Sequence, residues 1–267
     1  MHDIFFIAHV LDQDILKARA ILAGVTKSPE HHTFTRIQHF ELIDRYVKGL
    51  PLIKDLARER NDHTAAWLEL HAAFLKQQYT VNIRTKILKD EVEAARNGLT
   101  RTIPPTRVRI LKWTEIPDPP SPAIPSWMYQ RRALDIWDPK QEQILADNGF
   151  QRTSTKYEEA YEYRKGRVVY SLTLLWTPND DSKDIDTDRV PNLPVPHDGL
   201  SGQDPKNTLG KYAPFWMLYV RALVDSKAEA VQQAHIVMAK LKDELDGVFE
   251  FKEYDRRSMD TRCHVPA

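Results

Sequence analysis

The stretch FQRTSTKYEEAYEYRKGRVVYSLTLLW, residues 150–176, predicts two long neighbouring strands. Its second half alternates apolar and small polar side chains, which is typical of a strand with one buried face. The apolar positions are Val168, Tyr170, Leu172, Leu174 and Trp176, and the polar ones are Ser171 and Thr173. Because Arg164-Lys165-Gly166 reverses the chain between the two halves, we expect a β-hairpin with a defined, apolar inner face.

The hairpin follows a strand, helix and strand arrangement that the sequence repeats. The clearest unit is the last, where strand 215–224 precedes a helix whose apolar side chains recur every three or four residues. Ser226 and Glu229 form a possible capping box at the start of this helix, and Gly247 is expected to end it. A second strand is then expected over residues 249–254.

Two earlier units have the same order. One runs from strand 4–10 through a helix to strand 33–40, and the other from strand 128–136 through a short helix to strand 150–163. The expected residues at the helix ends are Asp12 and Gly24 in the first unit, and Asp138, Pro139 and Gly149 in the second.

Residues 81–87 and 107–113 also have an extended pattern, so about eight strands are expected. Repeated strand, helix and strand units fit a parallel α/β sheet as well as an antiparallel barrel. The residue pattern alone leaves both folds open.

We expect one domain over residues 1–267, with three additions. Residues 51–98 predict a helical insertion, with Trp67, Leu70, Phe74 and Leu75 at helical spacing. Seven prolines make residues 104–125 an irregular connection, and residues 179–211 form a second irregular loop because they have no apolar period.

Composition narrows the possible functions. Among 267 residues, 38 Lys and Arg balance 38 Asp and Glu, which disfavours a general nucleic-acid-binding protein. Cys263 is the single cysteine, so no intrachain disulfide can form and a reducing compartment is expected. The apolar runs are too short to span a membrane and no signal peptide is recognisable, so we expect a soluble, intracellular protein.

The usual motifs of nucleotide-binding and metal-binding proteins are missing. Gly210-Lys211 lacks the first glycine and the Ser or Thr of a phosphate-binding loop. His31 and His32 are adjacent on an expected strand and would point to opposite faces, while His63 and His71 have no carboxylate to complete a ligand set. We therefore predict no catalytic, cofactor-binding or metal-ligating residues, and no cofactor.

The most enzyme-like stretch is YEEAYEYR, residues 157–164, where Glu158, Glu162 and Arg164 share one strand face. Carboxylates and a cation inside a barrel could hold a divalent metal and a triphosphate, as in tunnel-type hydrolases. Such a site needs more acidic residues than this strand offers. We therefore favour a solvated outer face with cross-strand pairing for these side chains.

Aromatic residues cluster twice, at Trp127-Met128-Tyr129 and at Phe215-Trp216 with Tyr219. Because no excess of Lys or Arg lies between them, core packing or partner binding is favoured over the stacking of nucleic-acid bases.

Two segments near the C-terminus are distinctive: LKDELDG (241–247) and DRRSMDTR (255–262). Further such segments are MHDIFF (1–6), ILAG (21–24), His31-His32, IPDP (116–119), Arg131-Arg132, NGF (148–150) and Lys165-Gly166. Together they resemble the Mediator subunit 18 family of the RNA polymerase II coactivator, most closely at 241–247 and 255–262. The similarity covers both ends of the chain and residues 107–177.

The resemblance implies a mainly β fold: a closed, mostly antiparallel eight-stranded β-barrel with flanking helices, related to tunnel-type triphosphatase barrels. It implies a noncatalytic structural subunit of the Mediator head module, located in the nucleus. The implied partners are Mediator subunit 20, a C-terminal helix of Mediator subunit 8, other head subunits and RNA polymerase II. The alternative function is a metal-dependent triphosphate hydrolase on the same barrel, and the residues of the partner surface are not predicted.

Overall fold

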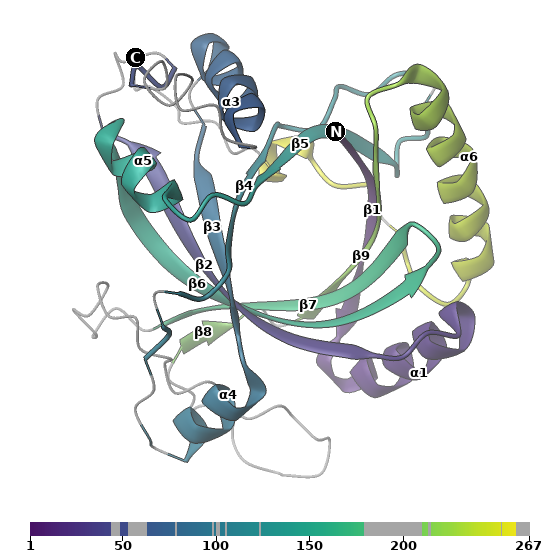
Figure 1. Cartoon of the computed structure of the whole chain (residues 1–267). Helices are drawn as coiled ribbons and strands as arrows, with labels where there is room; N and C mark the ends of the chain where they lie inside the picture. Colours follow the sequence, from purple (N-terminus) through teal and green to yellow (C-terminus); the bar gives the residue numbers. More distant parts are fainter. Residues whose placement is uncertain are drawn as a thin grey trace.

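The computed structural model is a β-barrel with helices on its outer surface (Figure 1). The structure describes residues 1–43, 49–52, 63–77, 79–97, 99, 102–104, 106–122, 124–178, 210–212, 215–251 and 253–259. None of the helices in these ranges is long and apolar enough to cross a membrane.

The strands are β1 (His2–Leu11), β2 (His31–Leu42), β3 (Val81–Ile87), β4 (Arg109–Thr114), β5 (Tyr129–Ile136), β6 (Phe150–Lys165), β7 (Val168–Pro178), β8 (Gly210–Tyr212) and β9 (Phe215–Val224). The helices are α1 (Ile15–Thr26), α3 (Thr64–Lys76), α4 (Lys89–Arg96), α5 (Gln141–Asp147) and α6 (Ala228–Leu245). Short 3-10 helices cover Asp12–Asp14 and Arg256–Met259.

Eight of the described strands close into a ring in the order β6-β2-β3-β4-β5-β1-β9-β7. The pairing of β6 with β7 closes the ring, and all strand pairs of the ring are antiparallel. The short β8 pairs with the end of β7 outside the ring. The predicted closed, antiparallel eight-stranded barrel with flanking helices is therefore confirmed, and a parallel α/β sheet is ruled out.

The outer face of the barrel is the apolar one. On β1, Ile4, Phe6 and Ala8 are buried in one cluster with side chains of α1 and α6. Val168, Tyr170 and Leu172 of β7 belong to the same cluster. The expectation that these β7 side chains face the barrel interior is thus wrong: alternation identifies two faces of a strand, but it does not say which one is concave.

The helices cover the outer face in separate groups (Figure 1). Leu22 of α1 and Met238 of α6 are fully buried against β1, β7 and β9. On the opposite side, Trp67 of α3 and Leu145 of α5 pack against Trp113 of β4. A smaller cluster lies beneath α4. The apolar faces of these helices therefore pack against the outer face of the barrel.

Two of the expected additions contain barrel strands. The helical insertion at residues 51–98 holds α3 and α4, but β3 lies between them and pairs with both β2 and β4. The Pro-rich connection at 104–125 is interrupted by β4. Of the loop at 179–211, residues 179–209 lie outside the described residues, and Gly210 and Lys211 belong to β8. β3 coincides with the extended pattern predicted at residues 81–87, and β4 overlaps the one predicted at 107–113.

Several predicted helix ends are wrong. α6 begins at Ala228 with no side-chain cap, so Ser226 and Glu229 form no capping box. α1 continues past Gly24, and Lys27 takes the left-handed conformation with φ 53°. α5 begins at Gln141, after Pro139. Left-handed Gly149 and Gly247 do follow their helices, as predicted.

Within the described part of residues 249–254, the expected strand is reduced to a single bridge between Phe251 and Ala8. The rings of Phe251 and Phe6 meet edge to face, 4.9 Å apart. Aromatic packing therefore holds this segment on β1, whereas the sequence predicted the hydrogen bonds of a paired strand.

Candidate functional site

The concave face of the barrel carries charged side chains from strands that are distant in sequence. Asp3 of β1, only 1% exposed, accepts hydrogen bonds from Arg131 of β5 and Arg221 of β9 at 3.2 Å each. The Arg131 guanidinium also lies 4.6 Å from the centre of the Phe5 ring. One carboxylate thus holds two guanidinium groups on neighbouring strands.

Two more ion pairs continue this interior cluster. Arg84 of β3 donates to Glu158 of β6 at 2.9 Å, and Lys112 of β4 lies 3.4 Å from Asp135 of β5. Burial lowers the pKa of Lys112, while the nearby Asp135 carboxylate acts in the opposite direction. Burial likewise lowers the pKa of Arg131, with Asp3 opposing it.

A cavity of about 330 Å³ is formed among these residues. Glu158, Glu162 and Arg164 line it together with Asp3, Arg84, Lys112, Arg131 and Arg221. The prediction of a solvated outer face for Glu158, Glu162 and Arg164 is therefore wrong. The other face of β6, which carries Tyr157, Tyr161 and Tyr163, is buried under the outer helices and loops.

Two of the three described carboxylates that line the cavity are engaged by cations, and the third is Glu162. Asp3 is shared by two arginines, and Glu158 is bound to Arg84. Across the described residues, no group of three His, Cys, Asp or Glu side chains is arranged to hold a metal ion. The geometry therefore favours ion pairing over metal ligation at Glu158.

The histidines considered as possible ligands take part in local hydrogen bonds. His32 Nε2 lies 2.7 Å from Glu159 Oε1, and Tyr161 donates to the same carboxylate oxygen. His71 Nδ1 accepts the backbone N–H of Leu50 at 2.8 Å, so a purely solvated helix-surface position is wrong for this residue. His31 is exposed and pairs across the sheet with Glu162 in the strand register.

The two aromatic clusters belong to the packed core. Trp127 meets Phe6 edge to face on the outer side of the barrel, whereas Tyr129 stacks on Phe5 on the inner side. Trp216 of β9 donates from Nε1 to Asp12 at 3.0 Å. The prediction that Asp12 caps a helix is therefore wrong, because its side chain makes no cap hydrogen bond. The side chain of Phe215 lies outside the described residues.

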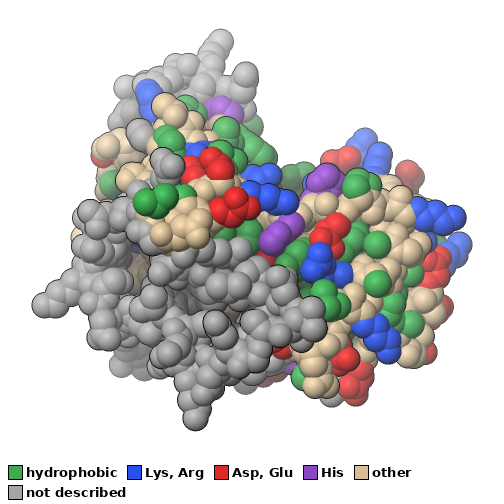
Figure 2. Space-filling model, turned by 90° about the horizontal axis from the view of Figure 1, so that it is seen from below, with side chains coloured by type: hydrophobic (Ala, Val, Ile, Leu, Met, Phe, Trp, Pro, Cys, Tyr) green, Lys and Arg blue, Asp and Glu red, His purple; other side chains and the backbone are tan. Residues whose placement is uncertain are grey.

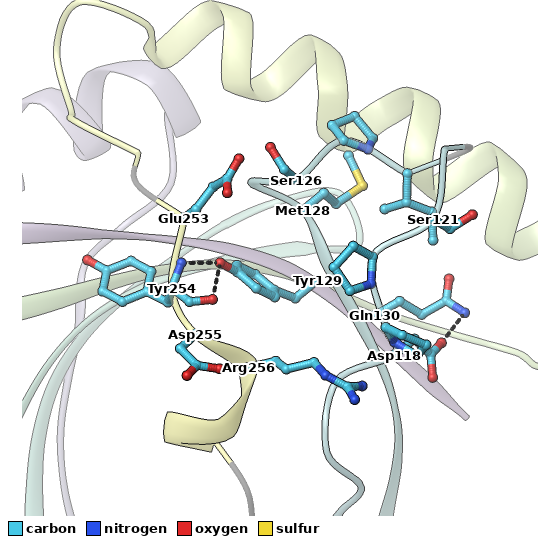
Figure 3. Close-up of a pocket in the computed structure, with 14 residues that line it drawn as sticks. Asp118, Ser121, Ser126, Met128, Tyr129, Gln130, Glu253, Tyr254, Asp255 and Arg256 are labelled. Carbon is cyan, nitrogen blue, oxygen red and sulfur yellow. Dashed lines mark hydrogen bonds between the residues drawn. The ribbon is translucent and has the colours of Figure 1, made fainter.

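A second pocket, also about 330 Å³, lies where the C-terminal segment crosses the barrel (Figure 3). Its walls come from the Pro-rich residues before β5, from the start of β5, and from residues 253–256. The Tyr129 hydroxyl accepts the Tyr254 backbone N–H and donates to the Tyr254 carbonyl. Gln130 and Asp118 are joined by a hydrogen bond of 2.9 Å on the opposite wall.

The C-terminal segment is docked as far as the structure describes it. Tyr254 and Met259 pack with Phe5 and Ile7 at the inner face, and Arg256 donates to the Pro117 carbonyl at 3.0 Å. Asp255 and Arg256, at the start of the segment 255–262 that resembles the family, therefore belong to one wall of the pocket. Residues 260–262 lie outside the described part.

The visible outer surface shows no dominant charge. In the described part of the face drawn in Figure 2, Lys and Arg side chains alternate with Asp and Glu and with hydrophobic groups. This distribution matches the balanced composition of the chain.

Comparisons with solved structures show similar folds. A chain of the Schizosaccharomyces pombe Mediator head module has a TM-score of 0.57 at 10% identity, over 94% of this chain and 98% of that one. A Pyrococcus horikoshii protein has a TM-score of 0.44 at 11% identity, over 96% and 97% of the two chains. A Hippeastrum protein described as having a dominant triphosphatase activity has a TM-score of 0.41 at 9% identity, over 97% and 96%.

Sequence comparison gives the family. A search of curated protein sequences found no significant match. The family model described as Med18 protein matches residues 2–262, nearly the whole chain. This match spans both ends and the middle segments that resemble the Mediator subunit 18 family. The chain therefore belongs to the Med18 protein family.

Proposed function

We propose that this protein is a noncatalytic subunit of the Mediator head module, a nuclear coactivator of RNA polymerase II transcription. The observation that carries the proposal is the family match over residues 2–262. The chain also has the same fold as a chain of the S. pombe head module, over nearly all of both chains, which is consistent with the proposal.

The proposed partners are Mediator subunit 20 and a C-terminal helix of Mediator subunit 8, within an assembly with other head subunits that meets RNA polymerase II. A closed ring leaves no long free sheet edge, so partners must use outer faces or loops. The pocket beside Tyr254 is one candidate, since prolines and partly buried apolar groups line it next to polar atoms.

Coexpression tests the partner assignment. The protein, subunit 20 and the C-terminal part of subunit 8 are expected to coelute in size-exclusion chromatography. Separate elution of all three would contradict the proposal.

Two variants test whether the pocket binds the subunit 8 helix. Ser126→Arg places a long cation at the exposed rim of the pocket, and Ser226→Arg makes the same change at an exposed site before α6. If the subunit 8 helix uses this pocket, only Ser126→Arg releases it.

The proposed lack of catalytic activity is supported by the ion pairs of the interior carboxylates. A metal-dependent hydrolase needs carboxylates free to bind the ion. Here Arg84 binds Glu158, and two arginines share Asp3. We expect no phosphate release above background from a nucleoside triphosphate with manganese or magnesium. Metal-dependent turnover that disappears in Glu162→Ala would instead support the hydrolase alternative.

A further inference from the structure

The barrel interior has more cationic than anionic groups. Among the described residues that line the cavity, five are Arg or Lys and three are Asp or Glu. Asp135 adds a fourth carboxylate beside Lys112 and still leaves an excess cation. A cavity lined by an excess of one sign of charge concentrates the field of that charge, so this cavity attracts an anion.

The arginines also retain hydrogen-bond donors. A guanidinium has five N–H groups. Arg221 directs only Nε to Asp3, and its side chain makes no other hydrogen bond to the described residues. Arg164 lines the same cavity, and its guanidinium has no partner within the described part of the chain. The donors of both residues are available to a ligand.

Lys112 and Tyr219 contribute further donors from other directions. Lys112 is only 22% exposed, and the positive charges of Arg221 and Arg84 add to burial in lowering its pKa. Burial raises the pKa of Tyr219, although Arg131 partly offsets this, so the phenol remains a donor at neutral pH. Donors thus converge on the cavity from β4, β6 and β9.

We propose that the barrel interior binds a small anion of the phosphate class, held directly by Arg221, Arg164 and Lys112. Phosphate oxygens accept several hydrogen bonds at once, and their geometry suits guanidinium groups. A cavity of about 330 Å³ lies at the small end of the range for ligand pockets, which fits an inorganic phosphate or a short phosphate chain. Because Asp3 and Glu158 are already bound to arginines, the anion needs no bridging metal ion.

Calorimetric titration of the purified full chain with sodium pyrophosphate in the presence of EDTA tests the proposal. Arg221→Gln removes a cavity cation, while Arg131 still neutralises Asp3. Loss of one charged hydrogen bond corresponds to a weakening of about tenfold or more in affinity. The matched control is Arg132→Gln, since Arg132 lies next to Arg131 but pairs with Glu69 of α3 outside the barrel.

Saturable binding of pyrophosphate that weakens in Arg221→Gln and is unchanged in Arg132→Gln is the expected result. No binding at millimolar pyrophosphate, or equal affinity in the two variants, would overturn the proposal. If Arg221→Gln does not fold, Arg164→Gln at the exposed end of β6 replaces it with the same expectations. Parallel titrations with orthophosphate and ATP distinguish a site for free phosphate chains from one that also accepts a nucleotide.

Discussion

At the scale of single residues, Asp3 joins two arginines on neighbouring strands of the barrel. It is almost completely buried and forms ion pairs with both Arg131 and Arg221. Asp3→Asn would leave two guanidinium groups close together in a desolvated interior. Breaking such a buried pair is expected to lower the free energy of unfolding by about 3–5 kcal/mol, as measured by urea denaturation.

Asp118→Asn provides the control for Asp3→Asn. Asp118 accepts one hydrogen bond from Gln130 and is exposed at the rim of the C-terminal pocket. Its substitution should change stability by less than about 0.5 kcal/mol. Equal stability losses in the two variants would contradict the role assigned to Asp3.

His39 makes the stability of the fold depend on pH. Burial, together with the nearby positive charges of Lys156 and Arg84, lowers the pKa of His39 from 6.5 to about 4. The unfolded chain therefore takes up this proton at a higher pH than the folded protein. The stability that neutral His39 provides is present above about pH 6.5 and is lost as the pH falls towards 4.

His39→Gln removes this proton uptake. Between about pH 7 and about pH 5, the wild type should lose about 1 to 2 kcal/mol more than the variant, since the partly solvated ring reduces the full effect. Urea denaturation of both proteins at the two pH values measures the difference. Parallel pH profiles would show that His39 titrates alike in both states.

The sequence showed which residues of β6 share a face, but it could not show their partners. Glu158, Glu162 and Arg164 are correctly grouped by alternation. The decisive contacts join Asp3 to Arg131 and Arg221, which are 128 and 218 positions away. Such pairings depend on the order of strands around the ring, and no local pattern records that order.

At the scale of elements, two backbone hydrogen bonds to one side chain add to the aromatic packing that holds the C-terminal segment. The Tyr129 hydroxyl both accepts from and donates to the backbone of Tyr254. Tyr129→Phe removes both bonds and should lower stability by about 1–2 kcal/mol. Hydrogen exchange in a peptide that covers residues 249–259 should become faster.

Tyr254→Phe is the matched variant for Tyr129→Phe. The Tyr254 hydroxyl is buried and makes no hydrogen bond to the described residues, so its removal breaks none. Exchange in residues 249–259 should stay at the wild-type rate. If Tyr254→Phe accelerates exchange as much as Tyr129→Phe does, the Tyr129 hydroxyl is not what holds the segment.

Strongly patterned elements were predictable, including the short strands β3 and β4, but the aromatic-rich C-terminal segment was not. The hairpin of β6 and β7 turns at left-handed Gly166, as its sequence predicts. Residues 249–254 alternate like a strand, but their described part makes one bridge, and the Phe251 ring packs edge to face on Phe6. The conformation of this segment is therefore decided by tertiary contacts, which the local sequence does not contain.

At the scale of the whole molecule, the barrel is built with its apolar side outward. The helices supply apolar surface on the outside, and the interior holds a cluster of charged side chains beside a small apolar group around Phe5. A strand pattern cannot distinguish this arrangement from an apolar interior, because both have the same alternation. The resemblance to a family selected the barrel, and only the structure showed which face is concave.

Closure of the ring predicts that the molecule unfolds as one unit. The clusters under α1 and α6 and under α3 and α5 lie on opposite sides, yet every barrel strand is hydrogen-bonded to two neighbours. Loss of one side would leave open strand edges on the other. We therefore propose a single domain, with one cooperative transition for both sides.

Fluorine NMR of protein labelled with 5-fluorotryptophan tests this cooperativity. Trp67 reports on the cluster under α3, and Trp216 reports on the cluster under α1. Substitution of each by Phe assigns its signal. Both native signals should disappear at the same urea concentration and match the circular dichroism transition. If the Trp67 signal is lost while that of Trp216 persists, the α3 side is a separate folding unit, and closure does not couple the two halves.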